Sequence, residues 1–585
     1  MTFDAHLVAS DWLSSFSSAL ARRDVCLSTT LFLPDGWLRD VFTLTWDIRT
    51  LEGQDKIAAY LSESLAKTQI INIRLDETPD LAPRVCTVPL SENMSSVQFG
   101  FQFELPHGHG CGLARLVEDP NGTFRAFTVL LALCELRGHE EFSRLPFRDD
   151  LLVQGRDPEA EYAEWIRQVE TEPHVLIVGG GQSGLDVAAR FKQMNIPSLV
   201  IEKNARVGDN WRKRYPSVTL HSIRRQHTML YQPFPSTWPD FSPRDKLAGW
   251  LEQYVITQDL VVWTKSELQA HPQYDEKTGQ WEVIVVREGV EVKLRPSHII
   301  MATGMLGRPL IPAFIDVERF RGQYMHSSKF PGGALFAGKR AVIIGAGESS
   351  IDICQDLVLK GANSVTMIQR SSSCVIRRDF FNNFMKQLFP EDEPMDVSDL
   401  KFAAMPLSLQ TKLMVASRQS IIDAHEDVYE KLRKGGFSVI PGPDGGGTYV
   451  MYYTRGGGYW LDKGGAELIG NGRIKVKHGT VDRFIENGLV LSDGTELLAD
   501  VVVFATGYTS MRESNAEVLG PEIMKHVGPV GGRDEDGEVN GLFRQCGHPG
   551  LWFAGGDFFY SRFFSKQLGL QIQAIQSGIL DVPKH

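Results

Sequence analysis

Two similar stretches decide the fold: HVLIVGGGQSG at residues 174–184 and RAVIIGAGESS at residues 340–350. In each stretch a short apolar run leads directly into a glycine-rich turn, and a sequence with helical spacing follows. This is the pattern of a βαβ unit, in which a strand of a parallel sheet enters a tight turn and then a helix. Because the pattern occurs twice, the sequence predicts an α/β fold with two dinucleotide-binding, Rossmann-like units.

The first stretch predicts a site for FAD. Its first glycine permits the tight turn, its second lets a pyrophosphate approach the backbone, and its third lets the helix pack on the strand. The helix N-terminus offers free N–H groups to phosphate. The next strand, 198–201, ends in an acid whose carboxylate can accept both ribose hydroxyls. The predicted contacts are Gly179, Gly181, Gln182, Ser183, Gly184 and Glu202.

The second stretch predicts a site for NADPH. A serine replaces the third glycine, so helix and strand should lie slightly further apart. The returning strand, 364–368, ends in Gln-Arg-Ser with no carboxylate, and an arginine there pairs with a 2′-phosphate that an acid would repel. Arg377 or Arg378 are alternatives for that contact. The predicted contacts are Gly345, Gly347, Ser349, Ser350 and Arg370.

Composition and charge limit the other functions. The 585 residues carry a net charge of −11, which argues against nucleic acid as a partner. None of the seven cysteines forms a Cys-x-x-Cys pair, so we expect inert thiols, no disulfide framework and no metal site. No apolar run is long enough to span a bilayer, and the N-terminus has no signal-peptide pattern. We therefore expect a cytoplasmic protein without a transmembrane segment.

The chain before the first glycine motif has a different pattern. Apolar residues recur at helical spacing over 7–20, and a second short helix is expected over 55–65. Residues 97–105 then alternate strictly between apolar and polar, as in a half-buried strand, and Asn121-Gly122 indicates a hairpin. The predicted domains are an α+β unit at 1–135, a connector at 136–172, an FAD unit at 173–335 and 500–585, and an NADPH unit at 336–499.

Residues 172–585 resemble the class B flavin monooxygenases, a family that includes flavin-containing monooxygenases, plant YUCCA-type enzymes, N-hydroxylases and Baeyer–Villiger enzymes. The segment 320–330 resembles the family fingerprint F-x-G-x-x-x-H-x-x-x-(Y/F/W). Ala-Thr-Gly turns at 302–304 and 505–507 also match, and the segment 215–235 is most similar to the YUCCA-like branch. The resemblance implies further cofactor contacts at Gly208, Trp211, Arg212, Thr303, Gly304, Thr506, Gly507, Gly556 and Asp557.

The resemblance also suggests two candidate catalytic residues. His326 is the histidine of the fingerprint, and a hinge role between domains is the alternative for it. His221 falls about where animal-type members carry a substrate-side asparagine, and a packed or capping histidine is the alternative there.

Residues 1–135 resemble the SnoaL-like domains of the nuclear-transport-factor superfamily, a curved sheet wrapped by helices into a cone. The resemblance rests on the segments 35–40 and 44–50 and on the late strands. Cones of this type host catalysis or mediate dimerisation, so a homo-oligomer is compatible with it. Asp40, Asp47, His107 and His109 are candidates to line a pocket.

The family resemblance implies a monooxygenase. NADPH would reduce FAD, and the reduced flavin would react with O2 to a C4a-(hydro)peroxide that inserts one oxygen atom into a small organic substrate. Baeyer–Villiger or oxidative decarboxylase chemistry on a ketone or 2-oxo acid is an alternative, as is a non-oxygenating NADPH oxidase. An additional cyclase or isomerase activity of the N-terminal unit is a third interpretation. Because every cofactor motif follows residue 172, the sequence predicts that flavin binding does not need that unit.

Overall fold

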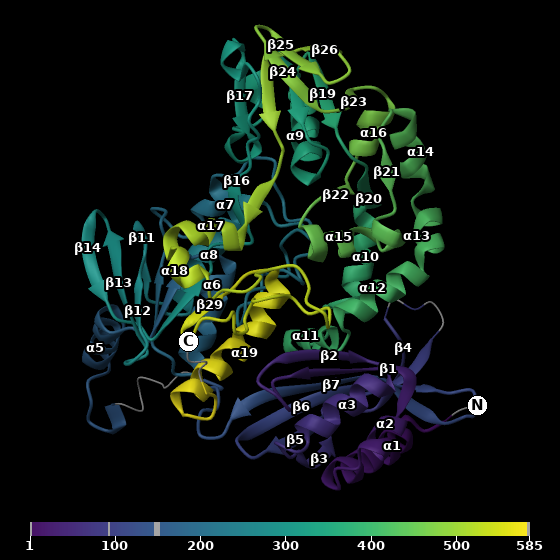
Figure 1. Ribbon diagram of the computed structural model, residues 1–585, viewed down its shortest axis with the longest axis vertical. Coiled ribbons are helices and arrows are strands. Elements are labelled where there is room, and N and C mark those ends of the chain that lie inside the picture. The colour runs from purple at the N-terminus through teal and green to yellow at the C-terminus, as the bar shows by residue number, and fades with distance from the viewer. Residues whose placement is uncertain (1–2, 90, 92–93, 145–151, 582–585) are drawn as a thin grey trace.

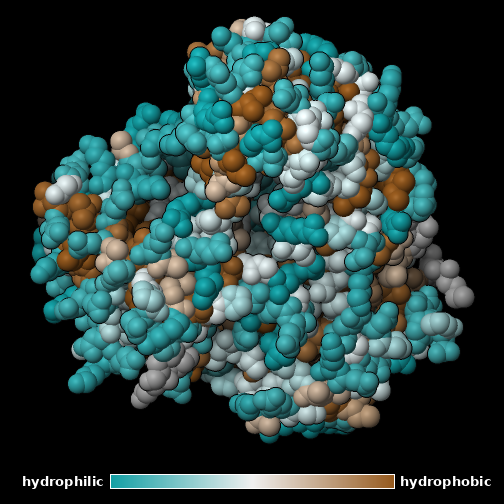
Figure 2. All heavy atoms as spheres, turned by 45° about the horizontal axis from the view of Figure 1, so that its top comes forward, coloured by the Kyte–Doolittle hydropathy of each residue, from teal (hydrophilic) through white to brown (hydrophobic). Residues whose placement is uncertain are grey.

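The computed structural model describes residues 3–89, 91, 94–144 and 152–581. In the view of Figure 1 the N-terminal unit lies at the bottom, one parallel sheet lies in the centre and a second forms the upper part. On the face drawn in Figure 2, hydrophobic side chains are scattered among hydrophilic ones, and the surface is hollowed near its centre, below the upper lobe.

The N-terminal unit is an α+β sheet in the order β2-β1-β7-β6-β5-β3, with β4 also paired to β5. Its apolar face packs against helices, as the predicted alternation requires. The polar face of β5 is buried at Gln98, which is 5% exposed, so the prediction of a half-buried strand is wrong at that end; Gln102 and Glu104 are partly exposed, as predicted. The elements are α1 (Ala5–Ala21), α2 (Val25–Thr30), β1 (Phe32–Val41), β2 (Ile48–Glu52), α3 (Gln54–Ser64), β3 (Ile71–Leu75), β4 (Arg84–Thr87), β5 (Ser95–Leu105), β6 (Gly108–Glu118) and β7 (Phe124–Leu136).

The first parallel sheet has the order β10-β9-β8-β15-β29. Its central strand β8 has β9 on one side and β15 on the other, so the first glycine turn leaves the sheet where the strand order reverses. The elements are α5 (Pro158–Thr171), β8 (Val175–Val178), α6 (Gln182–Gln193), β9 (Ser198–Ile201), α7 (Asp209–Arg212), α8 (Arg244–Thr257), β10 (Val262–Trp263), β15 (His298–Met301), β29 (Leu551–Phe553) and α19 (Phe558–Gln576).

The second parallel sheet repeats this arrangement in the order β17-β27-β18-β19-β23. The strand β18 lies between β19 and β27, so the second glycine turn also lies at a switch point. The predicted boundaries need a correction, because β17 and β27 were assigned to the FAD unit and instead pair with this sheet. The elements are β17 (Gln323–His326), β18 (Arg340–Ile344), α9 (Glu348–Leu359), β19 (Ser364–Gln369), α16 (Gly465–Gly470), β23 (Ile474–His478) and β27 (Val501–Phe504).

Smaller sheets and helices are inserted between these strands. The pair β16–β28 joins the two chain segments that follow the Ala-Thr-Gly turns. The inserted strands are β11 (Ser266–Leu268), β12 (Gln273–Asp275), β13 (Gln280–Arg287), β14 (Val290–Leu294), β16 (Leu306–Pro309), β20 (Ser373–Arg377), β21 (Val439–Ile440), β22 (Tyr459–Asp462), β24 (Val481–Ile485), β25 (Gly488–Leu491), β26 (Glu496–Leu498) and β28 (Tyr508–Ser510). The inserted helices are α10 (Arg378–Leu388), α11 (Met395–Ala403), α12 (Leu407–Ala416), α13 (Arg418–Ala424), α14 (Glu426–Lys434), α15 (Gly447–Arg455), α17 (Met511–Leu519) and α18 (Pro521–Met524).

One cysteine pair contradicts the expectation of free thiols. Cys111 of β6 and Cys134 of β7 form a disulfide, with their Cα atoms 6.2 Å apart. The two strands are hairpin neighbours, so residues separated by 23 positions in the sequence come together across the ladder. Among the described residues, no helix is both long and apolar enough to cross a membrane.

Candidate functional site

The first glycine of each motif is required by the protein's own backbone. Gly179 has φ of +119° and Gly345 has φ of +125°, a region that side chains with a Cβ rarely occupy. A Cβ on Gly179 would also lie 2.4 Å from the carbonyl oxygen of Ala302, and one on Gly345 would lie 2.3 Å from that of Ala505. Each turn therefore fits tightly against one of the Ala-Thr-Gly turns.

At the second glycine of each motif, neither the backbone conformation nor a neighbouring described atom requires glycine. Gly181 and Gly347 have ordinary negative φ values of −85° and −98°. A Cβ on Gly181 would meet only the side-chain nitrogen of Asn210, at 3.7 Å, and one on Gly347 would meet only the backbone nitrogen of Gly458, at 4.0 Å. The space in front of both glycines is open in the protein alone, as expected where a pyrophosphate approaches the backbone.

The third position differs between the motifs. A Cβ on Gly184 would lie 2.0 Å from the carbonyl oxygen of Gly179, so this helix packs directly on its turn. In the second motif Ser350 is fully buried, and its hydroxyl donates to the equivalent carbonyl oxygen, that of Gly345, at 2.6 Å. The serine replaces direct packing by a hydrogen bond, which fits the predicted wider spacing.

Both helices leave their first N–H groups available for an anion. α6 begins after Gly181 and α9 after Gly347, and neither glycine offers a side chain to cap the helix. Backbone N–H groups at a helix N-terminus bind phosphate, aided by the helix dipole. Gln182 and Ser183 lie in the first turn of α6, and Ser349 lies in that of α9.

Glu202 lies at the end of β9, as predicted, and faces the first turn. Its carboxylate accepts the N–H of Gly180 at 3.0 Å and the N–H of Asn204 at 2.8 Å, and the Asn204 side-chain amide donates to it at 2.6 Å. A carboxylate has about four acceptor positions. This arrangement therefore leaves room for one ribose hydroxyl, where the sequence predicted both.

The short helix α7 carries the next predicted contacts. Gly208 has φ of +84° and packs against α8, where a Cβ would lie 2.5 Å from the carbonyl oxygen of Ala248. The indole nitrogen of Trp211 is buried and has no hydrogen-bond partner among the described residues, which makes it a donor available to a ligand. Arg212 is engaged within the protein, with Glu252 and Asp209.

The two Ala-Thr-Gly turns lie beside the glycine motifs. Thr303 exchanges hydrogen bonds with the side chain of Asn515, and Gly304 has φ of +93°. Thr506 donates its hydroxyl to the carbonyl oxygen of Leu310 at 2.5 Å, and Gly507 has φ of +88°. The strands that follow the two turns, β16 and β28, pair with each other.

His326 has no ring nitrogen available for proton transfer. Its Nε2 donates to the carbonyl oxygen of Gly507 at 3.0 Å, and its Nδ1 accepts the N–H of Ser328 at 3.1 Å. Burial lowers its pKa, so the ring is neutral. This arrangement favours the hinge interpretation over the candidate catalytic role.

The C-terminal motif begins α19. Gly556 has φ of +109°, and the buried carboxylate of Asp557 caps the helix by accepting the N–H of Tyr560 at 3.0 Å. One turn further on, the hydroxyl of Ser561 donates to that of Ser183 at 2.9 Å. The motif therefore contacts the first turn of α6, as a loop that covers the first nucleotide requires.

Arg370 follows β19 at the open end of the second sheet and is exposed. The alternatives are occupied: Arg377 pairs with Asp379, and the guanidinium of Arg378 lies 4.2 Å from the ring centre of Phe241. In the described part of the chain, Arg370 makes no ion pair. It is the best placed of the three to contact a 2′-phosphate.

Sequence reasoning missed a charged cluster at the N-terminus of α9. The Nε2 atom of His221 lies 3.3 Å from a carboxylate oxygen of Glu348 and 4.0 Å from one of Asp352. Lys463 pairs with Asp352 at 2.6 Å, and Tyr215 donates to the same carboxylate at 2.9 Å. The i, i+4 spacing of the two acids was the one local signal. His221 therefore lies beside the second nucleotide turn, in a cluster where Lys463 supplies positive charge to the two acids.

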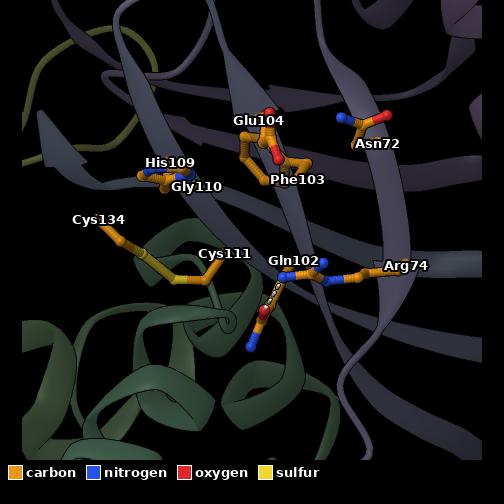
Figure 3. Close-up of a pocket in the computed structure, with 9 residues that line it drawn as sticks. All are labelled: Asn72, Arg74, Gln102, Phe103, Glu104, His109, Gly110, Cys111 and Cys134. Atoms are coloured by element: carbon orange, nitrogen blue, oxygen red, sulfur yellow. Dashed lines mark hydrogen bonds between the residues drawn. A yellow bond between two sulfur atoms is a disulfide. The ribbon is translucent and has the colours of Figure 1, made fainter. Parts of the chain in front are cut away.

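A pocket of about 260 Å³ opens on the N-terminal sheet. Figure 3 shows the Cys111–Cys134 disulfide on its wall, with His109 and Glu104 above and Arg74 reaching Gln102. Among the described residues, His109 is the one member of the four predicted pocket residues that lines it. Asp40 is instead buried, where it accepts the hydroxyl of Tyr60, and burial raises its pKa to about 6.

The two parallel sheets, each with a glycine turn at its switch point, define a protein with two dinucleotide-binding domains. Residues 172–393 match the model of the flavin-binding monooxygenase-like family. The indole-3-pyruvate monooxygenase YUCCA1 of Oryza sativa subsp. japonica is 27% identical over 58% of this chain and 77% of that protein. The probable indole-3-pyruvate monooxygenase YUCCA3 of Arabidopsis thaliana is 27% identical over 62% of this chain and 77% of its own.

Solved structures show the same fold. An oxidized steroid monooxygenase bound to NADP superposes with a TM-score of 0.51 at 18% identity, over 70% of this chain and 86% of that one. The polycyclic ketone monooxygenase of Thermothelomyces thermophila gives 0.50 at 16% identity, over 70% and 76%. The match over residues 172–393 and the curated relatives support a flavin-dependent monooxygenase.

Proposed function

We propose that FAD binds at the first glycine turn and NADPH at the second, and that the enzyme inserts one oxygen atom from O2 into a small organic substrate. The observation that carries this proposal is the open space at Gly181 and Gly347. No described residue requires glycine at these two positions, whereas a pyrophosphate lying against the backbone does. The unpartnered indole nitrogen of Trp211 supports a ligand beside the first turn.

The bound flavin would supply the redox chemistry, and the protein would bind, orient and exclude water. Gly181, Glu202 and the N-terminus of α6 would hold FAD. Gly347, Ser349 and Arg370 would hold NADPH. The curated relatives are named for a 2-oxo acid, indole-3-pyruvate, so we propose aromatic 2-oxo acids as the first substrate class to examine. A gain of one oxygen or a loss of CO2, detected by mass spectrometry, separates oxygenation from decarboxylation.

The N-terminal unit is proposed to be a SnoaL-like domain. The support is its α+β architecture, in which α1, α2 and α3 precede or interrupt a sheet whose late strands are antiparallel neighbours. A crystal structure of the enzyme would show whether the sheet closes into the expected cone.

Substitution of Gly181 tests the flavin site. Because a side chain at this position meets almost nothing in the protein, Gly181→Val should fold normally and yet purify with little or no FAD. Gly249→Val, on α8, is the matched control, since nothing lies within 4 Å of its Cβ position either. The absorbance ratio of flavin to protein is the measurement. A Gly181→Val enzyme with full flavin would contradict the proposal.

A further inference from the structure

Helix α11 lies beside α19, next to the N-terminal sheet (Figure 1). It begins at Met395, just beyond the residues that match the family model. Its apolar contact with α19 is tight, because the rings of Phe402 and Phe559 meet edge to face with centres 4.6 Å apart. α11 is therefore placed to connect the N-terminal unit with the flavin domain.

Two arginines of the N-terminal unit donate hydrogen bonds to carbonyl groups at the end of α11. The final carbonyls of a helix have no intrahelical partner and must be satisfied from elsewhere. Arg115 donates to the carbonyl oxygens of Lys401 at 3.0 Å and Ala404 at 3.3 Å. Arg39 donates to the carbonyl oxygen of Ala403 at 2.6 Å.

Both arginines are buried and fixed by partners of their own. Arg39 forms a two-pronged ion pair with Glu538, and Arg115 donates to the side chain of Gln98. Positive charge at the C-terminal end of a helix is favourable because the helix dipole is negative there. The N-terminal unit thus supplies two guanidinium groups where α11 needs them.

The middle of α11 is bound to α19 of the flavin domain by a second buried ion pair. Asp399 accepts two hydrogen bonds from Arg562 of α19, at 2.8 and 2.7 Å. The remaining nitrogen of Arg562 donates to the carbonyl oxygens of Gln226 and Thr228, both at 2.7 Å. Arg562 is 2% exposed, so these contacts are shielded from water.

The segment 226–230 contacts helix α6 and the start of α19. The side-chain amide of Gln226 donates to Asp557 at 3.4 Å, and the N–H of Leu230 donates to Asp186 of α6 at 3.1 Å. Ser561, the neighbour of Arg562, contacts Ser183 in the first turn of α6. A continuous set of buried contacts therefore runs from the N-terminal sheet to the proposed flavin site.

We propose that the N-terminal unit positions the flavin site, acting through α11 and Arg562 on the segment 226–230 and the first turn of α6. Arg115, Asp399 and Arg562 are positioning residues in this arrangement. The inference rests on the proposed flavin site, but the coupling itself can be measured in the protein without flavin.

Two conservative substitutions test the coupling, one at each end of α11. Arg115→Lys keeps the charge but cannot reach two carbonyls and Gln98 together. Asp399→Asn keeps the shape but removes the charge opposite Arg562. The controls are Arg125→Lys, in the same sheet and paired with Asp119, and Asp396→Asn, on the exposed side of α11. The measurements are hydrogen–deuterium exchange of the full chain, with and without FAD, and the dissociation constant for FAD.

We expect each test variant to speed amide exchange in 226–230 and in the first turn of α6 by about tenfold or more, and to weaken FAD binding by a similar factor. Exchange in α9 and β18 should not change, and both controls should match the wild type. The double variant should show no more than the larger single effect, because both substitutions interrupt one connection.

The proposal is overturned if exchange changes stop at α11, if they spread equally to α9 and β18, or if the two substitutions add. A variant that unfolds counts against it as well unless the other variant, studied alone, shows the localised change. If the wild type binds no FAD, the proposed flavin site fails. The exchange pattern of the flavin-free protein still decides the coupling.

Discussion

The three arginines considered for the 2′-phosphate of NADPH differ in their surroundings. Arg370 is exposed at the open end of the second sheet, whereas Arg377 and Arg378 are engaged within the protein. An arginine without a protein partner loses no contact when it binds a ligand. A 2′-phosphate carries close to two negative charges near neutral pH, and NADH has only a hydroxyl at that position, so Arg370 can distinguish the two nucleotides.

Replacing Arg370 should therefore reduce the preference for NADPH. A charge-assisted contact with phosphate contributes roughly 1.5–3 kcal/mol. Arg370→Ala should raise the KM for NADPH by about 10- to 100-fold and leave NADH kinetics almost unchanged. Arg378→Ala is the control. The measurement is the rate of flavin reduction by NADPH relative to that by NADH. If Arg370→Ala leaves this ratio unchanged, Arg370 is not in the site.

Asp186 is a second residue whose surroundings predict a measurable effect. It is fully buried on α6; one carboxylate oxygen accepts the N–H of Leu230, and the other has no hydrogen-bond partner in the described structure. Burial raises its pKa to about 7, against the lowering effect of Arg562. The native state therefore keeps a proton that the unfolded chain has already lost above about pH 4.

Because unfolding releases this proton, the contribution of Asp186 to stability is complete below about pH 4 and declines as the pH rises to about 7. Asp186→Asn removes the decline. Relative to the wild type, the variant should gain roughly 1–3 kcal/mol between pH 4 and pH 8. Thermal melting of both proteins at the two pH values measures this gain, with Asp396→Asn as an exposed control. A constant difference between variant and wild type would exclude the raised pKa.

At the scale of elements, what the sequence predicted was local. The strand, turn and helix of each βαβ unit agree with the structure within a residue or two, because apolar runs, glycines and helical spacing are adjacent in the chain. The burial of Gln98 on β5 was not predictable, because its partner Arg115 also binds the end of α11, almost 300 residues further along. The cluster of His221, Glu348 and Lys463 was not predicted either, because it joins three segments that are distant in the sequence.

The disulfide between β6 and β7 is the element-scale feature with the clearest test. Closing a loop with a sequence separation of 23 restricts the unfolded chain. In the loop-entropy account this stabilises the fold by up to about 3 kcal/mol. A phosphine reductant should lower the melting temperature of the wild type, and Cys111→Ser/Cys134→Ser should melt at that lower temperature with or without reductant. If the intact mass does not increase by two hydrogens on reduction, the disulfide is absent.

At the scale of the whole molecule, the N-terminal unit is not a separate appendage. One apolar core runs from the N-terminal sheet through α19 into the first parallel sheet. The carbonyl of Leu133 accepts a hydrogen bond from Gln567 at 3.3 Å, and Glu135 pairs with Lys566, both on α19. The order of motifs along the chain predicted a unit that flavin binding does not need, although assembly or substrate access does, because sequence order does not show which surfaces are in contact. The interface argues for the opposite.

We therefore expect residues 152–581 alone to lack full flavin binding. Removal of residues 1–144 exposes the apolar sides of α11 and α19, and a large exposed apolar surface promotes self-association. It also removes Arg39 and Arg115 from the end of α11, so the support of the segment 226–230 is lost. The fragment should form aggregates, bind a hydrophobic dye and retain a small part of the FAD of the full chain. Coexpression of residues 1–144 as a second chain should restore a monodisperse, flavin-containing complex, because the contacts are noncovalent. Arg115→Lys in that second chain should weaken the restoration, whereas Arg125→Lys should not. A monodisperse fragment with full flavin in the absence of the second chain would show that the N-terminal unit has no part in forming the flavin site.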